Sequence, residues 1–247
     1  MWVNAAAEKM AFRVQWVNVL RRDVSDTLTL VRPGLKTPRA AAVAGILFSI
    51  LLFSSLWLLR LSVPTDPLEI GPWLRTSSHR ITLALNFVPF AGIAFMWFLG
   101  VLRDRLGAKE DQFFATVFLG SGLMFLGMIF VAAAATGGLL RAYMAAPGEL
   151  FHPSTFAFAR SFVFDVMHIY AFKMAAVFMM STSTLILRTR VTPRWIAVLG
   201  FAAALILIVG SDYLDLFLFI FPAWVLLLSG TILIENLRRP RVANAQA

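Results

Sequence analysis

Three ionisable side chains, Asp165, His168 and Lys173, lie within one long apolar stretch of the chain, residues 160–190. An ionisable group at membrane depth costs several kcal/mol, on the order of 3 for a Lys near a helix centre, and it persists where another group pairs with it. On an α-helix Asp165 and His168 are neighbours on one face, and Lys173 lies about 12 Å deeper. The spacing therefore predicts a polar stripe that points into a helix bundle.

Five further polar residues are expected at the same end of that bundle. They are His79, Arg80 and Asn86 at the start of the second apolar run, and Asp212 and Asp215 at a tight turn before the sixth. With the stripe, they predict an outward-facing polar pocket lined by the second, fourth, fifth and sixth runs. Two interpretations stay open: a buried ion-pair network that fixes helix packing, and a proton or ion relay that leads to a midplane Lys.

The sequence supports no catalytic or metal site by motif. The chain has no Cys, which excludes disulfides, thiolate metal sites and Cys nucleophiles. It also lacks HExxH, paired E-x-x-H, G-x-S-x-G and Walker motifs. Asp165 and His168 could supply two metal ligands, and His79 or His152 could add a third. His79 and His168 could ligate a haem, but no motif supports either site. We therefore assign no catalytic residue, no metal ligand and no cofactor.

The composition predicts that membrane-spanning helices carry these polar residues. Of the 247 residues, 60% are hydrophobic and 14% are charged, whereas soluble domains are nearer half and a quarter. A bilayer crossing takes about 20 residues, and six apolar runs fill the chain. The expected spans are residues 40–59, 81–102, 113–138, 161–187, 195–210 and 213–234. The sequence thus predicts an all-α, polytopic membrane domain over residues 40–235.

The two ends of the chain flank this domain. Residues 1–39 form a basic arm, which is either an interfacial amphipathic helix or an ordinary cytoplasmic segment. Residues 236–247 form a tail. Sixteen of the 22 Lys and Arg residues fall in the arm, the tail and the connectors after the second and fourth spans. The positive-inside rule then predicts that both termini are cytoplasmic.

The net charge of +9 does not indicate nucleic-acid binding, because the Lys and Arg residues form short clusters between apolar runs. The expected partner is the lipid bilayer. The clusters anchor the topology, and five of their arginines could also hold anionic lipid head groups. These five are Arg103, Arg105, Arg188, Arg190 and Arg194.

Two groups of small or hydroxylated residues predict helix contacts. Gly120 and Gly127 are seven residues apart and share a face where another helix can approach closely. The run from Ser181 to Thr184 carries four hydroxyls, which can bond back to the preceding turn or across to a neighbouring helix. Both are interpreted as packing features.

Several segments are familiar in combination. They are NFVPFAGIAFMWFLGVLRDRLG (86–107), EDQFFATVFLGSGLMF (110–125), KMAAVFMMSTSTLILRT (173–189), PRW (193–195) and FPAWVLLLS (221–229). Together they resemble a group of uncharacterised bacterial six-span integral membrane proteins that are common in actinobacteria and their relatives. The resemblance implies the six-span architecture and a bacterial inner membrane. It implies no activity, substrate or catalytic residue.

Three functions remain in view from the sequence. The first is a non-enzymatic integral membrane protein that serves as an accessory or structural subunit of a larger membrane assembly. The second is a small proton- or ion-coupled transporter that uses the Asp165, His168 and Lys173 stripe. The third is a membrane enzyme or cofactor-binding protein with the outward-facing pocket as its site.

Overall fold

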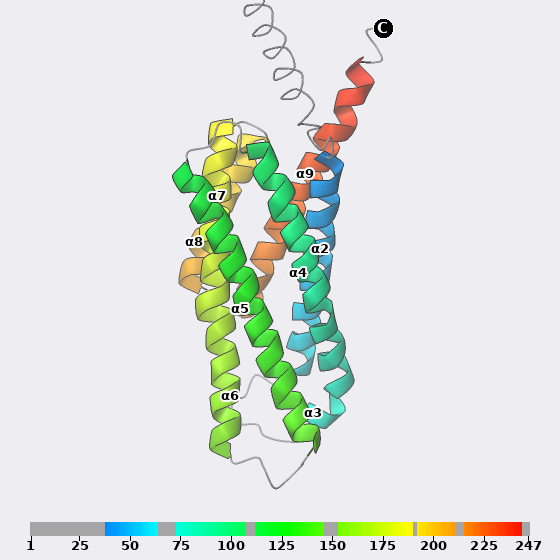
Figure 1. Ribbon diagram of the computed structural model, residues 1–247, viewed down its shortest axis with the longest axis vertical. Coiled ribbons are helices and arrows are strands. Elements are labelled where there is room, and N and C mark those ends of the chain that lie inside the picture. Colours follow the sequence, from blue (N-terminus) through cyan, green and yellow to red (C-terminus); the bar gives the residue numbers. More distant parts are fainter. Residues whose placement is uncertain are drawn as a thin grey trace, which may run out of the picture. The chain divides into compact units, whose positions relative to one another are not determined.

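A computed structural model describes residues 38–63, 73–106, 112–145, 153–189, 192–210 and 215–243. The chain divides into two units, residues 1–37 and residues 38–247, and the predicted interfacial helix of the basic arm lies outside the described residues. Every regular element in the described part is a helix (Figure 1). The elements are α2 (Pro38–Ser62), α3 (Trp73–Thr76), α4 (Ser78–Leu106), α5 (Gln112–Ala145), α6 (Pro153–Asp165), the π-helix η1 (Val166–Ala171), α7 (Phe172–Thr189), α8 (Arg194–Gly210), the 3₁₀-helix η2 (Asp215–Phe219) and α9 (Ile220–Ala243).

Five helical runs in the described residues are long and apolar enough to cross a membrane. They are Ala40–Ser62, Ser78–Arg103, Thr116–Ala145, Ser154–Thr189 and Leu216–Glu235. The predicted all-α class is therefore confirmed, and the apolar helices suggest a multi-pass membrane protein. A sixth apolar helix, α8, has 17 residues and is shorter than the other five. Several boundaries differ from the prediction. The third apolar run continues to Ala145, the fourth begins at Ser154, and α9 continues to Ala243 through much of the expected tail.

Six helices of the second unit pack as a ring. Helix α2 lies between α4 and α9, and α7 lies between α5 and α8. Contacts between α4 and α5 and between α8 and α9 close the ring. In Figure 1 the blue α2 and red α9 lie on one side, and the green α5 and yellow α7 on the other. Each of the six helices packs against the next one along the chain, as short connections favour.

Phenylalanine rings fill the centre of this ring of helices. Helices α2, α4, α5, α7 and α9 each contribute one ring to it, and all five are at most 2% exposed. We call this set, Phe48, Phe95, Phe125, Phe178 and Phe221, the central phenylalanine cluster. The ring centroids of Phe48 and Phe95 are 4.7 Å apart, and those of Phe125 and Phe221 are 4.8 Å apart. Tilted and edge-on pairs at these distances are the arrangements that aromatic quadrupoles favour.

Two serine–glycine contacts bring neighbouring helices close together. A Cβ on Gly200 of α8 would collide with Oγ of Ser183 on α7, and a Cβ on Gly45 of α2 would collide with Oγ of Ser229 on α9. Neither hydroxyl oxygen has a conventional hydrogen-bond partner among the described residues. Each oxygen instead lies against the glycine Cα, where Cα–H···O contacts form at close helix crossings. Small residues at interfaces allow such close approach in membranes.

Gly120 and Gly127, which were predicted to lie at a close helix contact, contact no other helix in the described structure. A Cβ on Gly120 or Gly127 would meet no described atom within 4 Å, and both residues are exposed on α5. The glycine of α5 that packs inward is Gly122, whose Cβ would come within 3.0 Å of Leu99 and 3.3 Å of Phe178. The face that holds Gly120 and Gly127 therefore points away from the bundle.

Two helical runs are longer than a bilayer needs. Helix α5 has 34 residues and the run Ser154–Thr189 has 36, which correspond to about 50 Å each. The hydrocarbon core of a bilayer is about 30 Å thick. Their surplus lies at the end of the bundle that carries α3 (Figure 1). There a second hydrophobic cluster, Leu74, Ile81, Leu140 and Phe156, packs α3, α4, α5 and α6 together.

Candidate functional site

The fourth predicted span is interrupted by the π-helical segment η1, between Asp165 and Phe172. The backbone N–H of Phe172 donates to the carbonyl oxygen of Met167, five residues earlier, where an α-helix would use the residue four earlier. Segments of this kind are rare, and they occur frequently at functional sites. The segment contains His168 and separates Asp165 from Lys173, so it lies within the stretch where the sequence places polar chemistry.

The wider turn changes which way the three ionisable residues point. Asp165 is exposed, His168 is only 8% exposed, and Lys173 is half-buried. The expected single inward-facing stripe is therefore not what the structure shows. That expectation used the α-helical angle per residue, and a π-turn takes more residues to complete one revolution. Asp165, the last α-helical residue before the segment, consequently lies on the outer surface of the bundle.

His168 is held by its own helix. Its Nδ1 lies 3.1 Å from the carbonyl oxygen of Phe164. A carbonyl oxygen can only accept, so Nδ1 carries the hydrogen in this contact. The imidazole also stacks on the ring of Phe164, with centroids 3.9 Å apart and planes 15° apart. The imidazole is thus a packed side chain with a fixed orientation.

Three of the five remaining residues of the predicted outward pocket lie on the surface of the described structure. His79, Arg80 and Asn86 are all exposed on α4. The side chains of Asp212 and Asp215 lie outside the described residues, although η2 begins at Asp215. No group of three or more His, Asp or Glu side chains that could hold a metal ion occurs among the residues that the structure describes.

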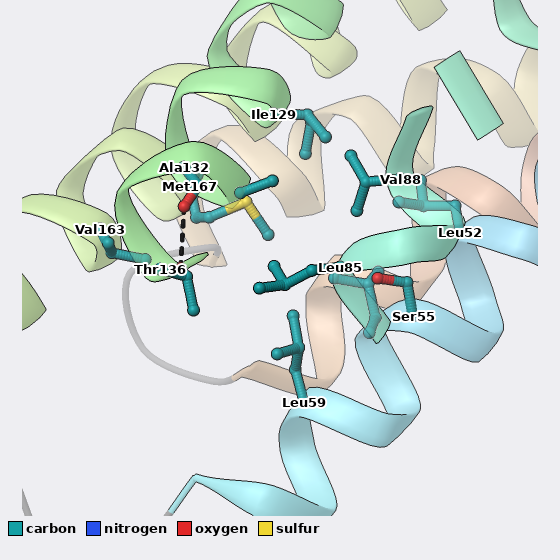
Figure 2. Close-up of a pocket in the computed structure, with 12 residues that line it drawn as sticks. Leu52, Ser55, Leu59, Leu85, Val88, Ile129, Ala132, Thr136, Val163 and Met167 are labelled. Carbon is teal, nitrogen blue, oxygen red and sulfur yellow. Dashed lines mark hydrogen bonds between the residues drawn. The ribbon is translucent and has the colours of Figure 1, made fainter. Parts of the chain in front are cut away.

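The cavity at this level of the bundle has an apolar lining (Figure 2). It lies between α2, α4, α5 and the α6–η1 run. Its lining residues are Leu52, Ser55, Leu56, Leu59, Leu85, Val88, Ile129, Ala132, Ala133, Thr136, Val163 and Met167. Helices α8 and α9, which would have lined the predicted pocket through the fifth and sixth spans, contribute no residue. Hydropathy did not reveal this cavity, because its lining residues look like ordinary core positions.

The two hydroxyls of the lining are already engaged. Ser55 Oγ donates to the carbonyl oxygen of Ala84 at 2.9 Å and so joins α2 to α4. Thr136 Oγ1 donates to the carbonyl oxygen of Ala132 at 2.8 Å within α5, the dashed line in Figure 2. Neither hydroxyl has a hydrogen to give to an occupant while these bonds persist. The cavity wall therefore presents hydrocarbon.

The hydroxyl run of α7 behaves largely as its sequence indicates. Ser181, Thr182 and Thr184 each donate to the carbonyl oxygen four residues earlier, at 2.7 to 2.9 Å. The fourth hydroxyl, Ser183, contacts Gly200 instead. Three of the four hydroxyls therefore bond within α7, and Ser183 alone of the four packs against α8.

The structure describes the side chains of three of the five arginines that were predicted to hold lipid head groups. Arg103, Arg188 and Arg194 are exposed near the ends of α4, α7 and α8, where those helices meet one end of the bundle. The side chains of Arg105 and Arg190 lie outside the described residues. Contact with lipid head groups stays a prediction for all five.

No protein-family model matches the chain. No curated protein and no solved structure matches it either. The resemblance to actinobacterial six-span proteins therefore stays a prediction.

Proposed function

We propose that this chain is a six-span protein of the bacterial inner membrane, with both termini in the cytoplasm. We further propose that it is a non-enzymatic, accessory or structural subunit of a larger membrane assembly. The observation that carries this proposal is the outward position of Asp165. The likeness to the actinobacterial six-span group is part of the same proposal.

Asp165 lies on an otherwise lipid-like surface. It shares a face of α6 with Phe158 and Phe162, which are 72% and 41% exposed. No described residue forms a hydrogen bond or ion pair with the Asp165 carboxylate. A carboxylate at membrane depth is costly when it faces lipid, and it persists where a partner supplies a donor or a cation. We infer that a helix of another subunit covers this face and bonds to Asp165.

The exposed face of α5 supports the same proposal independently. Gly120 and Gly127 leave a shallow strip on that face, and no part of the described chain fills it. Small residues one above the other are the usual means by which a second helix approaches closely in a membrane. A partner helix of the assembly would therefore find a second contact surface here.

The packing of the bundle interior favours this role over the transporter interpretation. The central phenylalanine cluster fills the bundle axis with rings from five helices. The cavity beside it is apolar, and His168 is packed against Phe164. A relay for protons or ions needs a chain of polar groups or water. Several of the hydroxyls buried in the described interior, such as Ser49, Ser121 and Thr182, instead donate to backbone carbonyl oxygens of their own helices.

The proposed topology needs α8 to cross the membrane. Its 17 residues correspond to about 26 Å, at the short end of the range for a membrane helix. Helix α8 packs closely on α7 along Gly200, and adjacent crossings in opposite directions are the simplest arrangement for two such helices. With α8 included, the number of spans is even, and the basic clusters all fall on one side.

The experiment is purification of the protein from its own membranes in a mild detergent, followed by native mass spectrometry. We expect co-purifying membrane subunits in a fixed stoichiometry. Asp165→Leu should lower the fraction of assembled protein about tenfold, because one interhelical bond in a membrane contributes about 1 to 2 kcal/mol. Asn86→Leu is the matched control, since Asn86 is also polar and exposed but lies on α4.

Two results would contradict the proposal. One is a wild-type protein that purifies alone at every detergent concentration tested. The other is an assembly that tolerates Asp165→Leu as well as it tolerates Asn86→Leu. Removing an exposed carboxylate should leave the isolated chain as stable as before, so a folding defect would not imitate the expected loss.

A further inference from the structure

We propose that the end of the bundle that carries α3 is a hinged cap, which moves as one body against the rest of the bundle. The cap consists of residues 73–85, 137–145 and 153–165, from α3, α4, α5 and α6, at the lower end of Figure 1. The second hydrophobic cluster is the core of this cap, and its buried residues are distinct from those of the main core around the central phenylalanine cluster. A part of a fold that has its own core can open or move as a cooperative unit.

The cavity shown in Figure 2 lies at the boundary between the cap and the bundle. Leu52 and Val88 of its lining belong to the main core. Leu59 and Leu85, also in the lining, pack against the second cluster. The volume of the cavity is about 40 Å³, far below the roughly 300 Å³ at which ligand pockets begin. The cavity therefore marks incomplete packing between two bodies, and it leaves their side chains room to shift.

Helix α4 is weakened where it passes this cavity. Pro89 lies inside α4, directly after Val88 of the cavity lining. Proline has no backbone N–H, so the carbonyl oxygen of Leu85 lacks its usual helical partner, and the proline ring favours a kink. Leu85 and Val88, the two α4 residues of the lining, therefore lie on the turn that Pro89 disrupts.

Helix α5 is weakened in the same layer. Thr136 lines the cavity, and its Oγ1 donates back to the carbonyl oxygen of Ala132, a bond that often bends helices. Gly137 and Gly138 follow directly, and glycine lowers helix stability relative to alanine by about 0.5 to 1 kcal/mol. A Cβ on Gly137 would lie 3.5 Å from Leu85, which places this weak segment beside the disrupted turn of α4.

The third weak point is the π-helical segment η1, whose Met167 also lines the cavity. Sharp changes of helix direction occur mainly at prolines, at glycine-containing pairs and at π-bulges. The described structure has one such feature in each of the three helical runs that continue from the bundle into the cap. All three lie beside one cavity, as a hinge between two bodies requires, because a single rigid run would prevent the movement.

The hinge has a consequence for the regulation of the protein. Asp165 is the last residue of the cap before η1. A partner helix that bonds to Asp165 would bind directly beside the hinge and hold the cap in one position. This link rests on the proposed function, whereas the hinge itself is a property of the chain alone.

The test measures distances between pairs of spin labels by double electron–electron resonance on the full-length protein in nanodiscs. Labels are attached to introduced cysteines, since the chain has no Cys of its own. Phe158→Cys in the cap is paired with Val198→Cys on α8, at positions that are 72% and 61% exposed. Trp97→Cys with Val198→Cys is the reference pair within the bundle. We expect the distance distribution between cap and bundle to be about twice as wide as that of the reference pair.

A stiffened variant links the movement to the proposed hinge. Pro89→Ala with Gly138→Ala restores a backbone donor in α4 and a better helix former in α5. Pro89 is exposed, and a Cβ on Gly138 meets no described atom within 4 Å, so both changes fit the fold. The distribution between cap and bundle should narrow to the width of the reference pair. Gly100→Ala with Gly120→Ala is the matched control, because these changes stiffen the same two helices away from the cavity and also meet no described atom within 4 Å.

Three results would overturn the proposal. The first is a distribution between cap and bundle as narrow as that of the reference pair. The second is a wide distribution that the stiffened variant leaves unchanged, or narrows no more than the control variant does. The third is an equally wide distribution within the cap, between Phe158→Cys and Arg80→Cys, because the cap would then not be one body. Size-exclusion chromatography shows that each labelled variant is folded and monodisperse. These measurements do not depend on whether other subunits co-purify, so failure here is distinct from failure of the proposed function.

Discussion

The imidazole of His168 lies flat on the ring of Phe164, and its Nδ1 donates to the carbonyl oxygen of that same residue. The two contacts hold a buried polar ring within the π-helical segment η1. A histidine so placed contributes to the packing of its helix, whatever partner its other nitrogen has. This relationship leads to the first prediction.

Substitution of His168 should separate stacking from hydrogen bonding. His168→Phe keeps a ring against Phe164 and loses the hydrogen bond, so we expect a loss of about 1 kcal/mol in unfolding free energy. His168→Ala also loses the ring, and the expected loss is about 3 kcal/mol. The measurement is thermal or denaturant unfolding in detergent micelles. His79→Ala is the control, because His79 is exposed and its removal should leave the unfolding free energy unchanged. A loss of unfolding free energy as large as that of His168→Ala would contradict the structural role of His168.

The central phenylalanine cluster should determine much of the stability of the bundle. Phe95 contacts four other rings of the cluster and is fully buried, whereas Phe90 on the same helix is 63% exposed. Phe95→Ala should cost about 3 kcal/mol, because the surrounding helices cannot close over the hole. Phe90→Ala should change stability by less than about 0.5 kcal/mol. Similar unfolding midpoints for the two variants in a denaturant titration would contradict the stabilising role of the central phenylalanine cluster.

Substitution of glycine by alanine should lower the unfolding free energy at one position and leave it unchanged or raise it at another. Gly200→Ala forces a methyl group against Ser183 and Trp224, and we expect a loss of about 1 to 3 kcal/mol. Gly230→Ala meets no described atom within 4 Å and should be neutral or stabilising, by up to about 1 kcal/mol. The double variant Gly200→Ala with Ser183→Ala should recover part of the loss, because one of the two collisions is removed. Full additivity of the two changes would argue against direct contact.

Single cysteines can test the proposed topology, because the chain has no Cys of its own. Ser211→Cys follows α8, and Ala108→Cys lies between α4 and α5. If α8 crosses the membrane, a membrane-impermeant maleimide added to intact spheroplasts should label Ser211→Cys at once. Ala108→Cys should react only after the membrane is permeabilised. Labelling of both cysteines from the same side would refute six spans with two cytoplasmic termini.

The sequence by itself determined the all-α class of the protein and the places of its long apolar helices. Apolar runs of about 20 residues predict helices in a bilayer, because no other structure satisfies the backbone there. Hydropathy therefore located the six apolar helices that the described residues form, including the short α8. Back-bonding by Ser181 and Thr182 was also predictable, since it involves only the preceding turn of the same helix.

Only the tertiary structure decided which way the polar residues point and what they surround. The π-turn after Asp165 shifts the helical register, and a pattern of hydrophobic residues does not encode it. The inward glycine of α5 is Gly122 rather than Gly120 or Gly127, because helix neighbours depend on how the whole ring of helices closes. The apolar cavity likewise arises where α2, α4, α5 and α6 fail to meet, and such a gap exists only between helices, not within any one of them.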